Sequence, residues 1–557
     1  MTDFYIAKDG TSGGTGAIGS PVQTVAQVLS LGAGLGDTVF FRTGTYDTEL
    51  DNAGDSTYHF KLSLEEIFSV KGYPGETVTF QPDNSVSYLL AYASGRNTTG
   101  AELTVTVENI NFITAADGSG CSSFIRLDSH ASTAHKIIWN IQNCTFTQTE
   151  NQHGLINGVF FSSSVPTVGQ THTIENCTFN ISHEHIINFT SMADTVNFKN
   201  NTVIVAQPAD ASANQVDKLF FLAGPNNISR VSQVNIENNT MDITLDDRND
   251  AEQIFQFDYI NNCNFIDNNI TTHKHPSQSA IGGTLGDIIR FYQSGNGTSH
   301  AHRQLKTVVL SGNRITRNDV RGNTFSFSGV SGGTEFAGST VTCTYNQDIR
   351  TDPINRTNDT GGAFLASNLH GQSESWIIKY NRIQNCQDGV SMISGGSGTN
   401  DISYNYFGNI GDDTAPLSTG VALKLNAVGS SSSRTPVHNN VFDNQQKAYQ
   451  VELTGDTHCD LVDNTFITRV ARTGSVGAFV TYFNTTASTG SQHTILGNRY
   501  LNTSNNNSNI LATQSGNDLA NEAALKAYDT DATFTNLTSK LTSDVNRKGY
   551  LTKTLGL

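Results

Sequence analysis

The chain has 557 residues and a formal net charge of −17, and only 15% of its residues are charged. Proteins that bind nucleic acid are usually basic, so this charge disfavours that class of function. Seven scattered cysteines without a C-x-x-C pair argue against a disulfide framework or a zinc site. No apolar run approaches the ~18 residues that a membrane helix needs.

Residues 1–50 are predicted to form an N-terminal cap. The segment YIAKDGTSGGTG at 5–16 indicates a strand and a Gly-rich turn, and GDTVFFRTGTY at 36–46 indicates a turn, a strand and a turn. Between them, SPVQTVAQVLSLG at 20–32 begins with Ser-Pro and has apolar residues at helical spacing, which predicts a helix. Such a helix would cover the open end of a core of stacked repeats. The first residues have neither a basic n-region nor an apolar h-region, so no signal peptide is predicted.

Residues 51–115 are predicted to form the first, less regular rungs, and the main repeat region follows to about residue 505. Its repeat motif is an apolar strand followed by Asn, a small or polar residue and an apolar residue. Examples are FKNNTV at 198–203 and ILGNRY at 495–500. Spacings of 24 to 68 residues between strand-like units are typical of a solenoid. The recurring asparagines are Asn201, Asn239, Asn268, Asn313, Asn381, Asn405, Asn440, Asn464 and Asn498.

Each unit is too small to bury its own apolar face, so the units must stack and pair strand upon strand. An Asn repeated at one turn can stack on its neighbours and bind main-chain groups that the turn leaves open. Two early repeats have Cys144 and Cys177 at this position, which suits an enclosed site. The ladder is therefore interpreted as structural, and it indicates the fold and not the chemistry.

The opening run KDGTSGGTG…PVQTVAQVL…GDTVFFRTGTY resembles the start of right-handed parallel β-helix proteins. Within that group it is similar to family 6 polysaccharide lyases (alginate lyases and chondroitinase B) and to phage tailspike-type depolymerases. The resemblance covers about 50 residues and the repeat pattern. It implies an all-β, right-handed parallel β-helix of about 11–13 rungs. The R-H-G context around the catalytic Lys and Arg of the family 6 lyases is missing, so no catalytic residue is carried over by motif.

The first strand of each repeat is expected to present its third and fifth residues outward from one sheet, because side chains alternate along a strand. The aligned strands are FIRLD at 124–128, IINFT at 186–190, LFFLA at 219–223, IFQFD at 254–258, IIRFY at 288–292 and ALKLN at 422–426. This alignment places Asp258, Arg290 and Tyr292 on neighbouring rungs of one face. Gln256, Lys424 and Asn426 belong to the same columns.

Basic residues exceed acidic ones by ten to six between 290 and 382, within an acidic chain. A local positive field would suit a polyanionic substrate, and solvated turn residues on several faces are the alternative. His300, His302 and Arg303 follow the IIRFY strand after a Gly-rich loop, and His370 lies on a later rung. A histidine of near-neutral pKa is a suitable proton carrier.

No metal site is predicted. The pairs HEH at 183–185, HKH at 273–275 and HAH at 300–302 lack a third ligand at known spacing. The acidic run DDRNDAE at 246–252 is suited in charge to Ca²⁺ but lacks the glycine and spacing of a known loop. No cofactor is therefore expected, with Ca²⁺ as the one alternative.

Residues 506–557 are predicted to form a C-terminal cap on a single β-helical domain that spans residues 1–505. DLANEAALKAY at 518–528 favours a helix with Asp518 as its N-cap, and NRKGYLTKTLGL at 546–557 a final strand.

Three hypotheses of function remain open. The first is a lyase that cleaves an acidic, uronate-containing polysaccharide such as alginate by β-elimination. In it, Arg290 neutralises the substrate carboxylate, Tyr292 or His302 carries the proton, and Asp258 orients one of them. The substrate-binding residues would be His300, Arg303, His370, Lys424, Gln256 and Asn426. The second is a tailspike-like depolymerase with hydrolase chemistry, and the third a glycan-binding β-helix without activity.

These hypotheses share expectations about partners and location. The expected partner is an acidic polysaccharide, with no nucleic acid and no membrane. The chain is expected to be a monomer or a homotrimer, and to be extracellular or associated with a virion.

Overall fold

The computed structural model of the chain consists of two compact units, Met1–Gly283 and Thr284–Leu557. The structure describes residues 1–51, 58–62, 68–84, 86–92, 102–115, 121–127, 136–148, 159–162, 170–182, 185–189, 194–206, 218–223, 231–245, 253–258, 260–274, 287–292, 305–318, 322–329, 336–350, 362–372, 374–395, 398–411, 420–430, 432–444, 449–455, 457–468, 481–484, 493–502, 511–514, 517–519 and 533–536.

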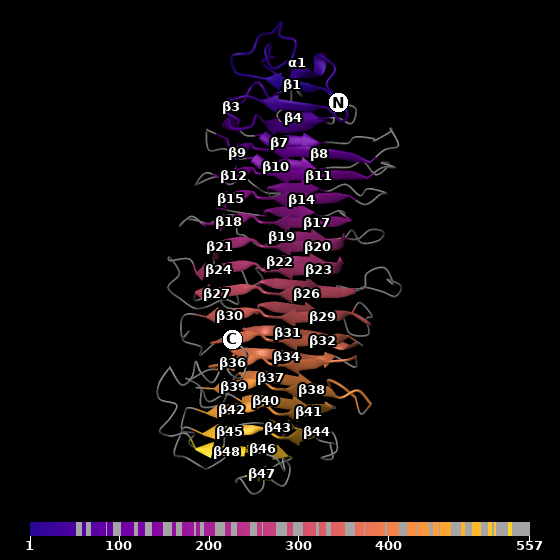
Figure 1. Ribbon diagram of the computed structural model, residues 1–557, viewed down its shortest axis with the longest axis vertical. Helices are drawn as coiled ribbons and strands as arrows, with labels where there is room; N and C mark the ends of the chain where they lie inside the picture. The colour runs from indigo at the N-terminus through magenta and orange to yellow at the C-terminus, as the bar shows by residue number, and fades with distance from the viewer. Residues whose placement is uncertain are drawn as a thin grey trace. The chain divides into compact units, whose positions relative to one another are not determined.

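Within each unit the chain winds through three sheets, which we call sheets 1, 2 and 3, and leaves one strand in each sheet per coil (Figure 1). Most strands pair in parallel with the strand three places further along the chain, as Ile125 pairs with Phe160 and Val308 with Val341. The exceptions are at the ends, where β1 pairs with β2 and β46 pairs antiparallel with β47. This pattern confirms the predicted parallel β-helix. Along the chain, the strands of one coil belong first to sheet 1, then to sheet 3 and then to sheet 2.

The first unit contributes 24 strands to the three sheets. Sheet 1 contains β1 (Asp3–Ile6), β2 (Thr38–Phe41), β5 (Ser69–Gly72), β8 (Leu103–Glu108), β11 (Ile137–Gln142), β14 (Thr171–Glu175), β17 (Thr195–Lys199), β20 (Val231–Glu237) and β23 (Ile260–Ile266). Sheet 2 contains β4 (Tyr58–Leu62), β7 (Val86–Tyr92), β10 (Cys121–Leu127), β13 (Phe160–Ser162), β16 (Ile187–Phe189), β19 (Lys218–Ala223) and β22 (Gln253–Asp258). Sheet 3 contains β3 (Gly44–Tyr46), β6 (Val78–Phe80), β9 (Asn111–Ile113), β12 (Thr145–Thr147), β15 (Thr178–Ile181), β18 (Thr202–Val205), β21 (Thr240–Leu245) and β24 (Asn269–Lys274).

The second unit contributes the other 24 strands. Sheet 1 contains β26 (Thr307–Ser311), β29 (Thr340–Thr344), β32 (Ser375–Lys379), β35 (Asp401–Ser403), β38 (Thr435–His438), β41 (Cys459–Val462) and β44 (His493–Leu496). Sheet 2 contains β25 (Ile289–Tyr292), β28 (Phe325–Ser328), β31 (Ala363–Gln372), β34 (Asp388–Gly395), β37 (Val421–Asn426), β40 (Tyr449–Thr454), β43 (Thr481–Asn484), β46 (Leu511–Gln514) and β47 (Asn517–Leu519). Sheet 3 contains β27 (Arg314–Asn318), β30 (Gln347–Arg350), β33 (Arg382–Gln384), β36 (Tyr406–Gly408), β39 (Val441–Asn444), β42 (Thr465–Thr468), β45 (Arg499–Asn502) and β48 (Thr533–Asn536).

The number of coils exceeds the prediction. The described residues contain 48 strands, three to a coil, against the 11–13 rungs expected from the sequence. The expectation was too low because the earliest coils have no Asn at the ladder position, and because the predicted ladder omitted Asn346. Asn346 fills the 68-residue gap between Asn313 and Asn381, and the amides of Asn313 and Asn381 both bond to it.

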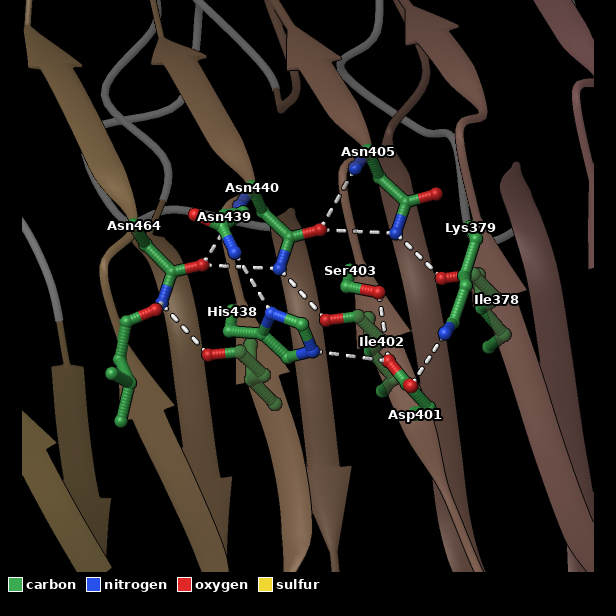
Figure 2. Close-up of polar contacts among 12 residues, drawn as sticks. Ile378, Lys379, Asp401, Ile402, Ser403, Asn405, His438, Asn439, Asn440 and Asn464 are labelled. Carbon is green, nitrogen blue, oxygen red and sulfur yellow. Dashed lines mark hydrogen bonds and ion pairs between the residues drawn. The ribbon is translucent and has the colours of Figure 1, made fainter. Parts of the chain in front are cut away.

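The asparagine ladder is confirmed as a chain of buried amides at the turn from sheet 1 to sheet 3. Asn440 is typical: its Oδ1 accepts hydrogen bonds from the backbone N and the Nδ2 of Asn405, at 2.9 and 3.0 Å. Its own Nδ2 donates to the carbonyl of Ile402 and to Oδ1 of Asn464 (Figure 2). Cys177 occupies the equivalent position, is buried, and donates its backbone N–H to Oδ1 of Asn201. The ladder therefore satisfies polar groups that a buried turn would otherwise leave open.

The N-terminal helix is shorter than predicted. Helix α1 spans Val25–Ser30, and its N-cap is Thr24, whose side chain forms a capping box with Gln27. The predicted Ser-Pro start is wrong because Val22 forms a parallel bridge with Ile6 and so is extended. That this helix caps the core stays a prediction. No helix among the described residues is long and apolar enough to cross a membrane.

At the C-terminal end, the predicted role of Asp518 as a helix N-cap is wrong. Asp518 lies in β47, which pairs antiparallel with β46. In this hairpin the backbone groups of β47 pair with those of β46, so no helix begins at Asp518. The rest of the predicted helix and the segment 546–557 lie outside the described residues. The division of the chain at residues 505 and 506 stays a prediction.

A buried histidine in the first unit makes stability depend on pH. His172 in β14 lies against Phe189, and burial lowers its pKa to about 3. The unfolded chain binds a proton at this imidazole below its ordinary pKa of 6.5 and the folded chain does not. The contribution of His172 to the free energy of unfolding is therefore fully present above pH 6.5. It falls by about 1.4 kcal/mol per pH unit as the pH drops toward 3.

We therefore expect His172→Phe to flatten the pH dependence of stability. The measurement is the urea midpoint at pH 7 and at pH 4.5 for the wild type and the variant. His273→Phe, at a half-exposed histidine of the same unit, is the control. An unchanged loss of stability in acid for His172→Phe would contradict the assignment.

Candidate functional site

The outward columns of sheet 2 have the register that the sequence predicted, within each unit. In the first unit the strand pairings align Arg126, Phe161, Asn188, Phe221 and Gln256. In the second unit they align Arg290, Ser326, Ala366, Ser391, Lys424 and Glu452. Arg290 and Lys424 therefore belong to one column, four strand pairings apart.

Arg290 and Tyr292 form a contact pair on β25. They are two residues apart in the strand and half-buried, between the inward-facing Ile289 and Phe291. The guanidinium carbon of Arg290 lies 4.7 Å from the centre of the Tyr292 ring. This cation–π contact holds the charged group beside the phenol.

Arg290 retains hydrogen-bonding capacity that the rest of the described chain does not use. Its Nε is buried and has no hydrogen-bond partner among the described residues. No carboxylate in that part of the chain lies within ion-pair distance of it. Buried donors are normally paired, and a guanidinium binds a carboxylate through two parallel bonds. The site is therefore suited to an anion with the geometry of a carboxylate.

Asp258 and Gln256 form a second pair, in the first unit. Nε2 of Gln256 donates to both carboxylate oxygens of Asp258, at 2.9 and 3.0 Å. Asp258 belongs to the first unit, whereas Arg290 and Tyr292 belong to the second. That Asp258, Arg290 and Tyr292 lie on neighbouring rungs of one face stays a prediction.

Lys424, expected to line a substrate groove, is paired with a residue that the sequence analysis missed. Its Nζ lies 3.6 Å from Oε1 of Glu452, its partner on the next strand. The segment YQVELT at 449–454 has the same alternation as the aligned strands, so its pattern could have identified Glu452. Asn426 lies two residues further along β37 and is half-buried.

Removing the partner of Lys424 should strengthen binding of an anionic polymer. We expect Glu452→Gln to lower the Kd for an acidic polysaccharide several-fold, because Lys424 loses its ion pair and the column gains net positive charge. Retardation in gels that contain the polysaccharide, at low and high salt, measures this effect. The control is Asp460→Asn, which breaks the ion pair between Arg434 and a strand of sheet 1. An equal effect of both variants would show general charge attraction and not a site on sheet 2.

The remaining predicted site residues are not placed. His300, His302 and Arg303 lie outside the described residues, as does the acidic run 246–252. His370 lies in β31, and the position of its side chain is not described. Among the residues that are described, no group of three or more His, Cys, Asp or Glu is arranged to hold a metal ion. The absence of a metal and of Ca²⁺ stays a prediction.

Among its described residues, the predicted positive segment between 290 and 382 has two basic and two acidic residues that are buried, so burial leaves the excess of basic residues unchanged. Arg317 and Arg350 are buried, and both donate to the carbonyl of Gly322. Thr324 bonds to Arg317 and to the buried carboxylate of Asp348. These two arginines face the interior because they alternate with outward residues, as Arg317 does with Thr316. Their charges are therefore not available to an external polyanion, and the buried Asp348 and Glu374 do not repel one either.

A second polar cluster, absent from the sequence analysis, lies where strands of sheet 1 end (Figure 2). At its centre is Asp401, whose carboxylate pairs with Nζ of Lys379 at 2.5 Å and Nε2 of His438 at 3.4 Å. Ser403 donates to the same carboxylate at 2.7 Å. We call Lys379, Asp401, Ser403 and His438 the Asp401 cluster. Lys379, Asp401 and His438 are each about a quarter to a third exposed, so they can also bond to a ligand, whereas Ser403 is buried.

Comparisons with known proteins give only distant likenesses. No protein-family model matches the chain. No curated protein sequence matches it. Among solved structures, the chain is similar to a mannuronic acid specific family 6 polysaccharide lyase from human gut microbiota, at 12% identity and a TM-score of 0.32, with 100% of this chain and 99% of that one covered. It is also similar to XylC in complex with xylose, at 9% identity and a TM-score of 0.18, with 93% of this chain and 85% of that one covered. Likenesses this low carry no argument about the site.

Proposed function

We propose that the chain is a polysaccharide lyase that cleaves an acidic, uronate-containing polymer on sheet 2 of the second unit. The observation that carries the proposal is the Arg290–Tyr292 pair. It joins a guanidinium without a carboxylate partner among the described residues to a phenol that can exchange a proton. These are the two functions that β-elimination from a uronate requires.

In this reaction Arg290 binds the uronate carboxylate and neutralises its charge, which acidifies the proton on the neighbouring C5 carbon. Tyr292 in its deprotonated form, or His302, takes this proton. The electron pair of the C5–H bond forms the C4–C5 double bond, and the bond from C4 to the glycosidic oxygen breaks. The departing oxygen receives a proton, from the same residue or from water. The products are a new reducing end and an unsaturated uronate, with no net oxidation.

The rest of the sheet 2 face would bind the neighbouring sugar units. Lys424 and Asn426 continue the columns that contain Arg290 and Tyr292, so a chain laid along the strands' stacking direction would contact them. A parallel sheet with strands about 4.8 Å apart offers such contacts at regular intervals.

The experiment is an absorbance assay for the unsaturated uronate. Purified protein is incubated separately with alginate, pectate, chondroitin sulfate, hyaluronan and a panel of bacterial capsules, and reducing ends are measured in parallel. A rise in absorbance on one polymer supports the lyase and identifies its substrate class. New reducing ends without that rise would contradict the lyase in favour of a hydrolase, and binding without either signal would favour a protein that only binds glycans.

A further inference from the structure

The residue that precedes each ladder asparagine has a left-handed backbone, and three of these residues are unusual. At most coils this position is filled by residues that adopt positive φ readily: Asn200, Asn238, Asp267, Gly312, Asn439, Asp463 and Gly497. Three coils in a row have tyrosine there instead. Tyr345, Tyr380 and Tyr404 each have a φ of 59°. A bulky side chain is disfavoured in this conformation.

The turn itself does not need tyrosine, because asparagine, aspartate or glycine makes the same turn in other coils. Backbone conformations that a residue disfavours persist where its side chain has another role. The reason for tyrosine at these three positions therefore lies in the contacts of the tyrosine rings and not in the turn.

The three rings form a stack on the surface, which we call the tyrosine stack. The ring centres of Tyr345 and Tyr380 are 4.9 Å apart with planes at 10°, and those of Tyr380 and Tyr404 are 5.1 Å apart at 14°. Tyr345 is 61% exposed and Tyr380 39%. They are two of the few large apolar side chains that the described residues expose.

The stack is closed at one end and open at the other. Beyond Tyr404, the next coil places His438 edge-on to the ring, at 5.7 Å and 77°. Before Tyr345, the preceding coil of the same unit has Gly312 at this position, which has no side chain. One face of the Tyr345 ring therefore has no aromatic neighbour among the described residues.

Polar groups border the stack. Lys379 and Ser403 directly precede Tyr380 and Tyr404, and both belong to the Asp401 cluster, as does His438. The cluster offers an ammonium, a carboxylate and an imidazole beside the rings, and the phenol hydroxyls of the stack add further donors. An aromatic face bordered by such hydrogen-bonding groups is suited to a ligand with one apolar face and many hydroxyls.

We propose that the tyrosine stack is a second saccharide-binding site, separate from the face proposed for cleavage. One pyranose ring packs its C–H face on the exposed face of Tyr345 that has no aromatic neighbour, on the side of Gly312. The hydroxyls of the adjoining sugar units bond to the Asp401 cluster. The site lies at the turn between sheets 1 and 3, so it would hold a polymer without occupying sheet 2. It requires no catalysis and goes beyond the proposed lyase activity.

The test is affinity electrophoresis in gels that contain alginate, pectate, chondroitin sulfate or hyaluronan. The protein has the Arg290→Ala substitution, so that the proposed cleavage does not consume the polymer. Tyr345→Asn removes the open ring and inserts a residue type that the same turn accepts in other coils. We expect it to raise the Kd of the retained polymer by about tenfold. Gly312→Asn, which adds a side chain at the equivalent position of the preceding coil, should have a similar effect.

The matched control is Tyr404→Asn, which removes the half-buried ring at the closed end. It should change the Kd by less than about twofold, because no sugar packs on that ring. The proposal is wrong if none of the four polymers retards the protein, or if the Tyr345 and Tyr404 variants behave alike. If the protein with Arg290 intact forms no unsaturated product on any of the four polymers, loss of retardation on Tyr345→Asn would still uphold this site and would contradict only the proposed lyase.

Discussion

Replacing Arg290 by alanine is expected to abolish the formation of unsaturated uronate, with kcat/KM lowered at least about a hundredfold. In the proposed reaction the guanidinium neutralises the carboxylate most fully as negative charge develops at C5, so its loss should lower kcat as well as raise KM. The measurement is the initial rate of absorbance increase on the polymer that the wild type cleaves. Circular dichroism should be unchanged, because Arg290 has no ion pair with another described residue to lose.

The matched control is Arg126→Ala. Arg126 lies on sheet 2 of the first unit, and its guanidinium carbon is 4.8 Å from the centre of the Tyr88 ring. This variant removes an equivalent cation–π contact and one positive charge without touching β25, so it should retain activity. Wild-type turnover by Arg290→Ala, or equal losses in both variants, would remove Arg290 from the mechanism.

Replacing Asn239 by alanine should lower the free energy of unfolding of the first unit by about 2–4 kcal/mol. Asn239 is buried, and its Oδ1 accepts bonds from the backbone N and the Nδ2 of Asn201. Its Nδ2 donates to the carbonyl of Phe198 and to Oδ1 of Asn268. Alanine leaves these partners buried without replacements, and desolvated polar groups without partners account for most of the expected loss.

Urea unfolding measures this change, and Asn269→Ala is the control. Asn269 occupies the next coil, is exposed, and has no side-chain hydrogen bond among the described residues. Its replacement should shift stability by less than about 0.5 kcal/mol. Similar shifts for both variants would mean that the ladder amides contribute little to stability.

Much of the fold followed from local patterns. The alternation of apolar residues and the recurring asparagines predicted parallel coils, and the alignment of the strand segments predicted the register on sheet 2. The same alternation contained information that was not used. Ile315 faces inward, so Arg317 two residues later must also face inward, and its charge should not have been counted on the surface. Asn346 in TYNQDI at 344–349 has the pattern of the other ladder residues.

The candidate site was predictable only in part. Arg290 and Tyr292 are two residues apart in one strand, so strand geometry alone brings them together. The pairing of Lys424 with Glu452 depends on which strands are neighbours, and 27 residues separate the two in sequence.

Side-chain alternation within short segments predicts the repeating unit, the parallel stacking and the composition of each outward column. The pairing of charges, the burial of individual arginines and the stacking of three tyrosines beside the Asp401 cluster depend instead on contacts between coils. These contacts are not predictable from local patterns because the coils are joined by loops of unequal length. Tyrosines 35 and 24 positions apart become stacked neighbours at about 5 Å, and no local pattern specifies those distances.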